Sequence, residues 1–231
     1  MRSSSPSTAL VVVVKSPCNR FTSAHCRAVN IPSGVKKLVA GATLKIRTKE
    51  RGNGQCVLVE GGLIITAAHC MDWDCNGMMA LGEFYLSKII TCSADLIAST
   101  LAVEPVSDIA VLGAPDDQSS PDEALAFDEF VGGISPVKLQ RLPPKVRTPF
   151  PVWIRTHVKT WVAGEATYFC GSRFAYRTGS EIRSGSSGGP IVNNVGELVG
   201  VVSHGTNSRA VNDIYFSPVT TTIIPHRTWF V

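Results

Sequence analysis

The chain has 231 residues, of which 44% are apolar and 17% charged, with 20 glycines, 14 prolines and a formal net charge of +4. Disordered chains are poorer in apolar residues and collagen-like repeats are far richer in glycine, so the composition indicates one globular unit or two small ones. The longest apolar run, residues 9–14, is much shorter than the ~20 residues that cross a bilayer, so we expect no membrane partner. The basic residues form no run longer than Lys36-Lys37, which argues against a nucleic-acid partner.

The start of the chain differs from the rest. Residues 1–37 contain many serines and fit neither half, so we expect an N-terminal extension that is flexible or loosely docked. Its apolar run imitates a secretory signal but is shorter than the ~7 to 15 apolar residues of such signals. Seven cysteines cannot all pair within one chain, which favours reduced thiols, with or without one bridge. Localisation stays open, with the inside of the cell favoured over secretion.

From Leu38 onward, short apolar segments rich in β-branched residues alternate with turn-forming residues, which predicts β-strands. The first six expected strands are 41–47, 55–59, 63–67, 84–92, 96–103 and 109–112. An acidic, proline-containing connector follows at 115–130. Seven more segments come after it: 137–139, 152–162, 166–170, 173–176, 190–192, 198–202 and 214–218.

Helical periodicity is nearly absent, and the proline-containing region 143–151 is expected to be a surface loop, because proline cannot occupy the middle of a hydrogen-bonded strand. Many short strands on both sides of one connector predict an all-β fold of two antiparallel barrels or sandwiches. We place the first unit at 38–125 and the second at 126–231.

Three motifs carry residue types used in catalysis. The motif T-A-A-H-C places His69 where a buried strand ends, although a histidine at a sheet margin can be structural. The motif S-D-I-A-V-L places Asp108 before an apolar strand, where a carboxylate either caps the strand or needs a donor such as an imidazole N–H. The motif G-S-S-G-G-P places Ser187 in a tight turn between strands, where N–H groups can converge; similar clusters also occur in flexible turns.

In this order the three motifs resemble those of the chymotrypsin-like (trypsin-fold) serine proteases, from about residue 38 to the C-terminus. The resemblance implies two antiparallel six-stranded β-barrels with the active site in the cleft between them. It also implies that Ser187 is the nucleophile, His69 the general base and Asp108 the carboxylate that orients the imidazole. The backbone N–H groups of Gly185 and Ser187 would form the oxyanion hole.

The resemblance requires no cofactor and no metal, and the cysteines lack the C-x-x-C pair common in structural zinc sites. Its partner is a peptide or protein substrate, and the oligomeric state stays open. The family often bridges cysteines at places similar to Cys56 and Cys70, so a bridge and two free thiols both remain open.

The resemblance extends to V-G-V-V-S-H-G, which is similar to the family segment that pairs with the substrate as an added strand. On that match Ser203, His204 and Gly205 line the substrate-binding edge, with His204 in the place of the usual tryptophan.

The bottom of the specificity pocket has two candidate residues. When residues are counted back from Ser187 as in the family pattern, the resemblance places Glu181 at the floor, where a carboxylate would select Arg or Lys. A shift of one residue would present Ile182 to an apolar side chain instead, and we favour this alternative.

Ser186 stands where the animal digestive enzymes carry an aspartate that pairs with a newly released α-amino group. A neutral serine cannot form that ion pair, so the resemblance is closer to bacterial or HtrA-like members. We therefore expect a serine endopeptidase that acts through an acyl-enzyme. The alternatives are a catalytically silent homologue used as a binding scaffold, and an esterase with the same triad.

Overall fold

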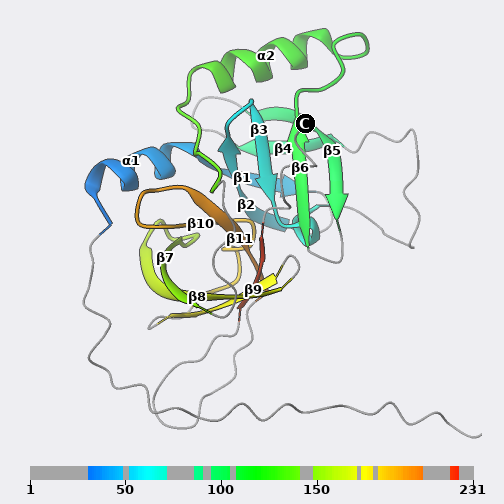
Figure 1. The fold of residues 1–231 in the computed structure, drawn as a ribbon. Coiled ribbons are helices and arrows are strands. Elements are labelled where there is room, and N and C mark those ends of the chain that lie inside the picture. The colour runs from blue at the N-terminus through cyan, green and yellow to red at the C-terminus, as the bar shows by residue number, and fades with distance from the viewer. Residues whose placement is uncertain are drawn as a thin grey trace, which may run out of the picture.

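The strands of the computed structural model form two closed antiparallel barrels of six strands each (Figure 1). The structure describes residues 31–48, 52–71, 86–90, 95–104, 108–140, 148–170, 173–178, 182–204 and 219–223. The prediction of an all-β fold with two six-stranded barrels is confirmed.

The first barrel has the strand order β1-β2-β3-β6-β5-β4. Its strands are β1 (Thr43–Thr48), β2 (Gly52–Val59), β3 (Leu63–Thr66), β4 (Leu86–Ile90), β5 (Asp95–Glu104) and β6 (Ile109–Gly113). In β1, Leu44 and Ile46 are buried whereas Lys45 and Arg47 are exposed, which is the two-residue alternation of a strand with one face on the core. All five residues of β6 are buried, so the strand that follows Asp108 is firmly anchored.

The second barrel has the strand order β10-β11-β12-β9-β8-β7. Its strands are β7 (Pro149–Arg155), β8 (Trp161–Cys170), β9 (Arg173–Thr178), β10 (Pro190–Val192), β11 (Leu198–His204) and β12 (Val219–Ile223). The expected strand at 152–162 is in fact the end of β7, a turn and the start of β8. The expected strand at 214–218 lies outside the described residues.

The prediction of a surface loop through Pro151 is wrong for its last residues, because β7 begins at Pro149. This end of β7 pairs with β8 alone, since β10 reaches β7 only at Trp153 and Ile154. Pro149 and Pro151 are exposed and have a neighbouring strand on one side only. Strands tolerate proline at such edge positions, because the missing N–H removes no hydrogen bond to a second neighbouring strand.

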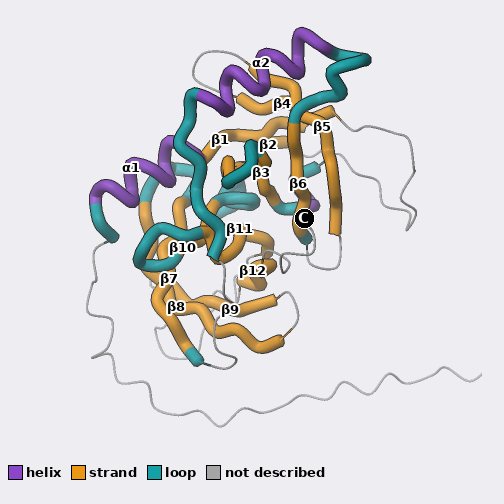
Figure 2. Tube along the Cα trace, turned by 45° about the horizontal axis from the view of Figure 1, so that its top comes forward, coloured by secondary structure: helices purple, strands orange, loops and turns teal. Residues whose placement is uncertain are grey.

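Two helices accompany the barrels in the described part of the chain, where the sequence led us to expect almost none. Helix α1 (Ser33–Ala42) begins within the expected N-terminal extension. Helix α2 (Pro121–Gly132) occupies the acidic connector and packs against β5 (Figure 2). Proline at its first position and two carboxylates in its first turn favour this N-terminus.

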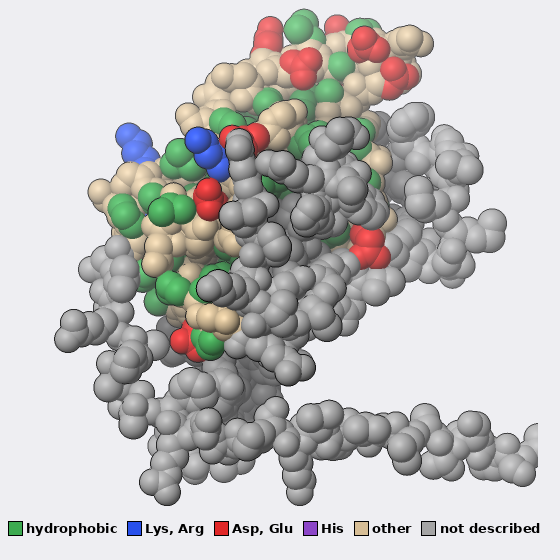
Figure 3. Space-filling view, in the orientation of Figure 1, with side chains coloured by type: hydrophobic (Ala, Val, Ile, Leu, Met, Phe, Trp, Pro, Cys, Tyr) green, Lys and Arg blue, Asp and Glu red, His purple; other side chains and the backbone are tan. Residues whose placement is uncertain are grey.

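Helix α2 has one buried and one solvated face. Ala124 and Phe127 are buried one turn apart, whereas Asp122, Glu123, Asp128 and Glu129 are exposed. Figure 3 shows these acidic side chains gathered over the helix. Within the residues that the structure describes, neither helix is long and apolar enough to cross a membrane.

The segment expected as a strand at 137–139 joins the two barrels. It forms two isolated parallel bridges, one from Val137 to Val59 of β2 and one from Leu139 to Leu198 of β11. The apolar core is also continuous between the barrels, because Trp153, Val192, Leu198 and Val201 pack with the side chains of the first barrel. The barrels therefore meet across a packed contact.

Candidate active site

His69 emerges from the end of β3 in a single 3-10 turn, Ala68–Cys70. Ala67 and Ala68 are buried and anchor the turn, while the His69 side chain is half-buried. The Ala68 N–H donates to the backbone carbonyl of Asp108 at 3.1 Å, which ties the turn to the residue before β6. The first barrel thus holds the imidazole at its rim.

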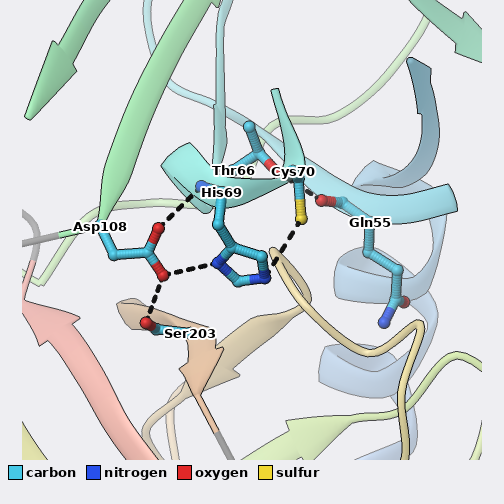
Figure 4. Close-up of polar contacts among 6 residues, drawn as sticks. All are labelled: Gln55, Thr66, His69, Cys70, Asp108 and Ser203. Atoms are coloured by element: carbon cyan, nitrogen blue, oxygen red, sulfur yellow. Dashed lines mark hydrogen bonds and ion pairs between the residues drawn. The ribbon is translucent and has the colours of Figure 1, made fainter. Parts of the chain in front are cut away.

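Asp108 orients His69 through both carboxylate oxygens (Figure 4). Its Oδ2 lies 2.7 Å from His69 Nδ1, and its Oδ1 accepts the His69 backbone N–H at 2.8 Å. Ser203 of β11 donates its hydroxyl to Oδ2 as well, so the second barrel contributes to this pair. Asp108 has a φ of 57°, in the left-handed region that aspartate tolerates better than most residues.

These contacts shift the protonation equilibria of both side chains. The hydrogen bond to Asp108, followed by one to Cys70, raises the pKa of His69 from 6.5 to about 10. Burial alone would raise the pKa of Asp108, but the hydrogen bonds from His69 and Ser203 outweigh burial and lower it. The pair therefore favours a carboxylate beside a protonated imidazole.

The second imidazole nitrogen of His69 lies beside a thiol. Its Nε2 is 3.9 Å from Cys70 Sγ. The sequence left open whether Cys56 and Cys70 form a disulfide. In the structure both are buried free thiols. Burial raises the pKa of the Cys56 thiol, which keeps it protonated and unreactive.

Ser187 lies in a loop that both barrels hold. Gln55 of β2 donates its backbone N–H to the Ser187 carbonyl at 2.8 Å, and the Gly188 N–H donates to the Val202 carbonyl of β11 at 2.7 Å. A Cβ on Gly188 would lie 1.9 Å from Gln55 O and 2.3 Å from Thr66 Oγ1, and φ there is +75°. Only glycine fits at this position.

The structure brings His69, Asp108 and Ser203 into direct contact and ties the Ser187 loop to β2, one of the two strands that lead to His69. Among the hydrogen bonds of the described residues, none joins Ser187 Oγ to His69 Nε2. Ile182 is buried in the apolar core of the second barrel. Glu181 and Gly205 lie outside the described residues, and so does the side chain of His204.

Sequence reasoning missed His157, which contacts the loop before Ser187. Its backbone N–H donates to Ser186 Oγ at 3.1 Å, and its Nδ1 lies 3.2 Å from the same oxygen. Ser186 is fully buried. The sequence predicts one continuous strand at 152–162, which includes His157. The polar pair Lys159-Thr160 interrupts the apolar pattern there and is the available sign of a turn.

No group of three or more histidines, cysteines or acidic residues within the described segments could hold a metal ion. The site as described offers an imidazole with a carboxylate partner and a serine in a glycine-rich turn. Such a set can transfer protons and form a covalent ester.

Comparisons with known proteins agree with the fold. A family model described as a trypsin-like peptidase domain matches residues 54–201, more than half of the chain. No curated protein matches the chain.

Solved structures with the same fold include the Rv3671c protease of M. tuberculosis in its active form, 17% identical with a TM-score of 0.53, covering 92% of this chain and 89% of that one. The serine protease of a human pathogenic astrovirus is 19% identical with a TM-score of 0.51, covering 83% of this chain and 93% of that one. The serine endoprotease of Yersinia pestis is 14% identical with a TM-score of 0.51, covering 84% of this chain and 63% of that one.

Proposed function

Because the chain belongs to the trypsin-like peptidase family, we propose that it is a serine endopeptidase in which His69, Asp108 and Ser187 form the catalytic triad. The observation that carries the proposal is the His69–Asp108 pair, in which both carboxylate oxygens accept hydrogen bonds from His69. A carboxylate that served only as a strand cap would not need to bind the imidazole as well as the main chain.

The proposed reaction begins with attack of Ser187 Oγ on the carbonyl carbon of the scissile bond. The neutral form of His69 accepts the hydroxyl proton at Nε2, and Asp108 stabilises the resulting imidazolium through Nδ1–H. The contact of Nε2 with Cys70 is long and a thiol is a weak hydrogen-bonding group, so the Ser187 hydroxyl can replace it. His69 then protonates the leaving amine, and an acyl-enzyme remains on Ser187.

Water completes the cycle. His69 Nε2 removes a proton from the water that attacks the ester carbonyl, and returns that proton to Ser187 Oγ as the acid product leaves. No metal or organic cofactor takes part in either half of this mechanism.

The N–H groups of Gly185 and Ser187 are proposed as the oxyanion hole. Within the described part of the chain, neither N–H donates to another protein group, so both are available to a substrate oxygen. Gly185 has a φ of +87°, which lets the backbone turn these two N–H groups toward one point.

The substrate is proposed to be a peptide or protein that pairs along Ser203, His204 and Gly205. Glu181 at the pocket floor would favour cleavage after Arg or Lys, whereas an apolar floor at Ile182 would favour Val or Leu. The ratio of the two cleavage rates, in wild type and in Glu181→Gln, distinguishes these pockets. An Arg preference that collapses in the variant supports Glu181, and absence of any cleavage after Arg excludes it.

Labelling with a fluorophosphonate tests the proposed function, with Ser187→Ala as the control. We expect the wild type to be labelled and to cleave members of a peptide library, and the variant to do neither. A wild type that is not labelled would identify a binding scaffold. Labelling with turnover of simple esters but no peptide would identify an esterase.

A further inference from the structure

We propose that His157 is a positioning residue that holds the oxyanion loop, defined as residues 184–187, in its catalytic conformation. This role rests on the proposed function, since it concerns the N–H groups of Gly185 and Ser187. His157 does not touch the reacting atoms; it acts through Ser186 and Gly185, which lie between it and the nucleophile.

The contact between His157 and Ser186 satisfies a fully buried hydroxyl. The His157 backbone N–H donates to Ser186 Oγ at 3.1 Å, so the oxygen already has a donor. Nδ1 lies 3.2 Å from the same oxygen, where it can accept a hydrogen bond from the Ser186 hydroxyl if the imidazole carries its own proton on Nε2. The Ser186 backbone is held separately, since its carbonyl accepts hydrogen bonds from the Gly189 N–H at 2.9 Å and from Gln55 Nε2 at 3.3 Å. Ser186 is uncharged and cannot form an ion pair, so the hydrogen bonds to His157 are what hold its side chain.

The imidazole also lies beside Gly185. A Cβ built on Gly185 would lie 3.5 Å from His157 Cγ, so the ring is about one methyl group away from the glycine. Gly185 has no side chain and a positive φ, which gives its peptide groups more freedom than other residues have. The ring therefore limits the space into which the residue with the proposed oxyanion-binding N–H can move.

His157 is itself rigidly held. It lies in the turn between β7 and β8, where the Thr156 N–H donates to the Thr160 carbonyl at 2.9 Å and the two threonine hydroxyls are 2.7 Å apart. Strand β7, which leads into the turn, pairs with β10, which follows the oxyanion loop; Ile154 and Ile191 face each other in this pairing. Both sides of the contact thus come from neighbouring paired strands.

The test compares His157→Ala with His157→Asn and His157→Gln, using the best fluorogenic peptide found by library profiling of the wild type. Asn can place Oδ1 near the position of Nδ1 and accept a hydrogen bond from the Ser186 hydroxyl, whereas the amide of Gln lies one carbon farther from the main chain. Removing one oxyanion donor costs ~10² to 10³-fold in kcat, so displacing it through His157→Ala should cost ~10 to 100-fold, with KM within about threefold. We expect Asn, but not Gln, to recover most of the loss.

Two further measurements separate positioning from a general loss of structure. The aldehyde analogue of the same peptide forms a tetrahedral oxyanion, so its affinity should fall in His157→Ala about as much as kcat does. Affinity for the intact peptide, measured in a Ser187→Ala background, should stay unchanged. Val158→Ala is the matched control, because Val158 is exposed in the same turn and should leave all parameters near wild type.

Ser186→Ala completes a double-mutant cycle with His157→Ala. If the two residues act through one contact, the double variant should lose little more activity than either single variant. Three results would each overturn the positioning role. They are additive losses of activity in the double variant, equal activities of His157→Asn and His157→Gln, and equal falls in the affinities for the aldehyde and for the intact peptide. A wild type that neither reacts with fluorophosphonate nor cleaves peptides would overturn the proposed function and this role with it.

Discussion

Replacing Asp108 with Asn exchanges one carboxylate oxygen for an NH2 group in a site where both oxygens accept hydrogen bonds. Oδ1 accepts the His69 backbone N–H, which cannot become an acceptor, so the amide oxygen should take this position. The NH2 group then faces His69 Nδ1, which must accept a hydrogen bond from it and therefore cannot carry a proton. The ring proton moves to Nε2, and Nε2 can no longer accept a proton from Ser187.

The size of the effect follows from the raised pKa of His69. A tenfold change in a protonation equilibrium is worth about 1.4 kcal/mol, so the rise from 6.5 to about 10 corresponds to at most about 5 kcal/mol of stabilisation for the imidazolium. The hydrogen bond to Asp108 is the largest single cause of this rise and the hydrogen bond to Cys70 is the second. The contribution of Cys70 and solvent screening of the partly exposed ring keep the share of Asp108 below that limit, so loss of its carboxylate should slow the reaction by up to ~10³ to 10⁴-fold, compared with the ~10⁴ of this replacement in the serine-protease triad.

The assay is kcat on the fluorogenic peptide, with the unfolding free energy from urea titrations as a second readout. Asp108→Asn keeps the acceptor for the His69 N–H but loses the carboxylate that raises the pKa of His69, so at neutral pH it should be less stable than wild type. Asp108→Ala also loses that acceptor and should be less stable than Asp108→Asn by about 1.5 to 3 kcal/mol, the usual contribution of a hydrogen bond to a charged group. Activity of Asp108→Asn within tenfold of wild type would refute the argument.

Three further outcomes follow from the same geometry. Since His69 must be neutral to act as a base, kcat/KM should rise with pH, and the midpoint of this rise should lie above pH 6.5. Cys70→Ala should move the midpoint to lower pH. A midpoint unchanged in the variant would contradict the contribution of the thiol. Gly188→Ala should destabilise the protein by ~2 kcal/mol or more in urea titrations, whereas Gly34→Ala, which has open space around it in α1, should leave stability within about 1 kcal/mol. A metal chelator should leave peptide hydrolysis unchanged, and loss of activity restored by zinc would disprove the metal-free mechanism.

The strands and the three motifs could be predicted from the sequence because their signals are local. Leu44 and Ile46 alternate with charged residues, and each motif spans five or six consecutive positions. Helix α2 also has a local signal, namely a proline and two carboxylates before Ala124 and Phe127. Two apolar residues are too short a pattern to show helical periodicity, and the acidic composition of the segment indicates a connector instead. The start of β7 was missed because whether a proline is tolerated in a strand depends on which neighbour pairs with it.

His157 could not be predicted, since its partner Ser186 lies 29 residues further along the chain. Nothing in the local sequence of either residue specifies the other. The contact exists because β7 and β10 pair, and strand order within a barrel is a property of the whole fold. The contact between Ser203 and Asp108 depends on the whole fold in the same way, since the two residues are 95 positions apart in the sequence. Motifs therefore identify the proposed reacting groups, whereas the residues that contact and orient them depend on the topology of the fold.

The hydrogen bonds between the barrels make the site depend on their docking. Asp108 belongs to the first barrel, but Ser203 of the second donates to its carboxylate. The Ser187 loop leads into β10 of the second barrel, but Gln55 of the first holds its carbonyl. The second barrel thus helps to position Asp108, and the first barrel helps to position Ser187. Separating them would leave Asp108 without one of its donors and the loop without its contact to β2, so the arrangement can persist only while the apolar core that runs between the barrels stays packed.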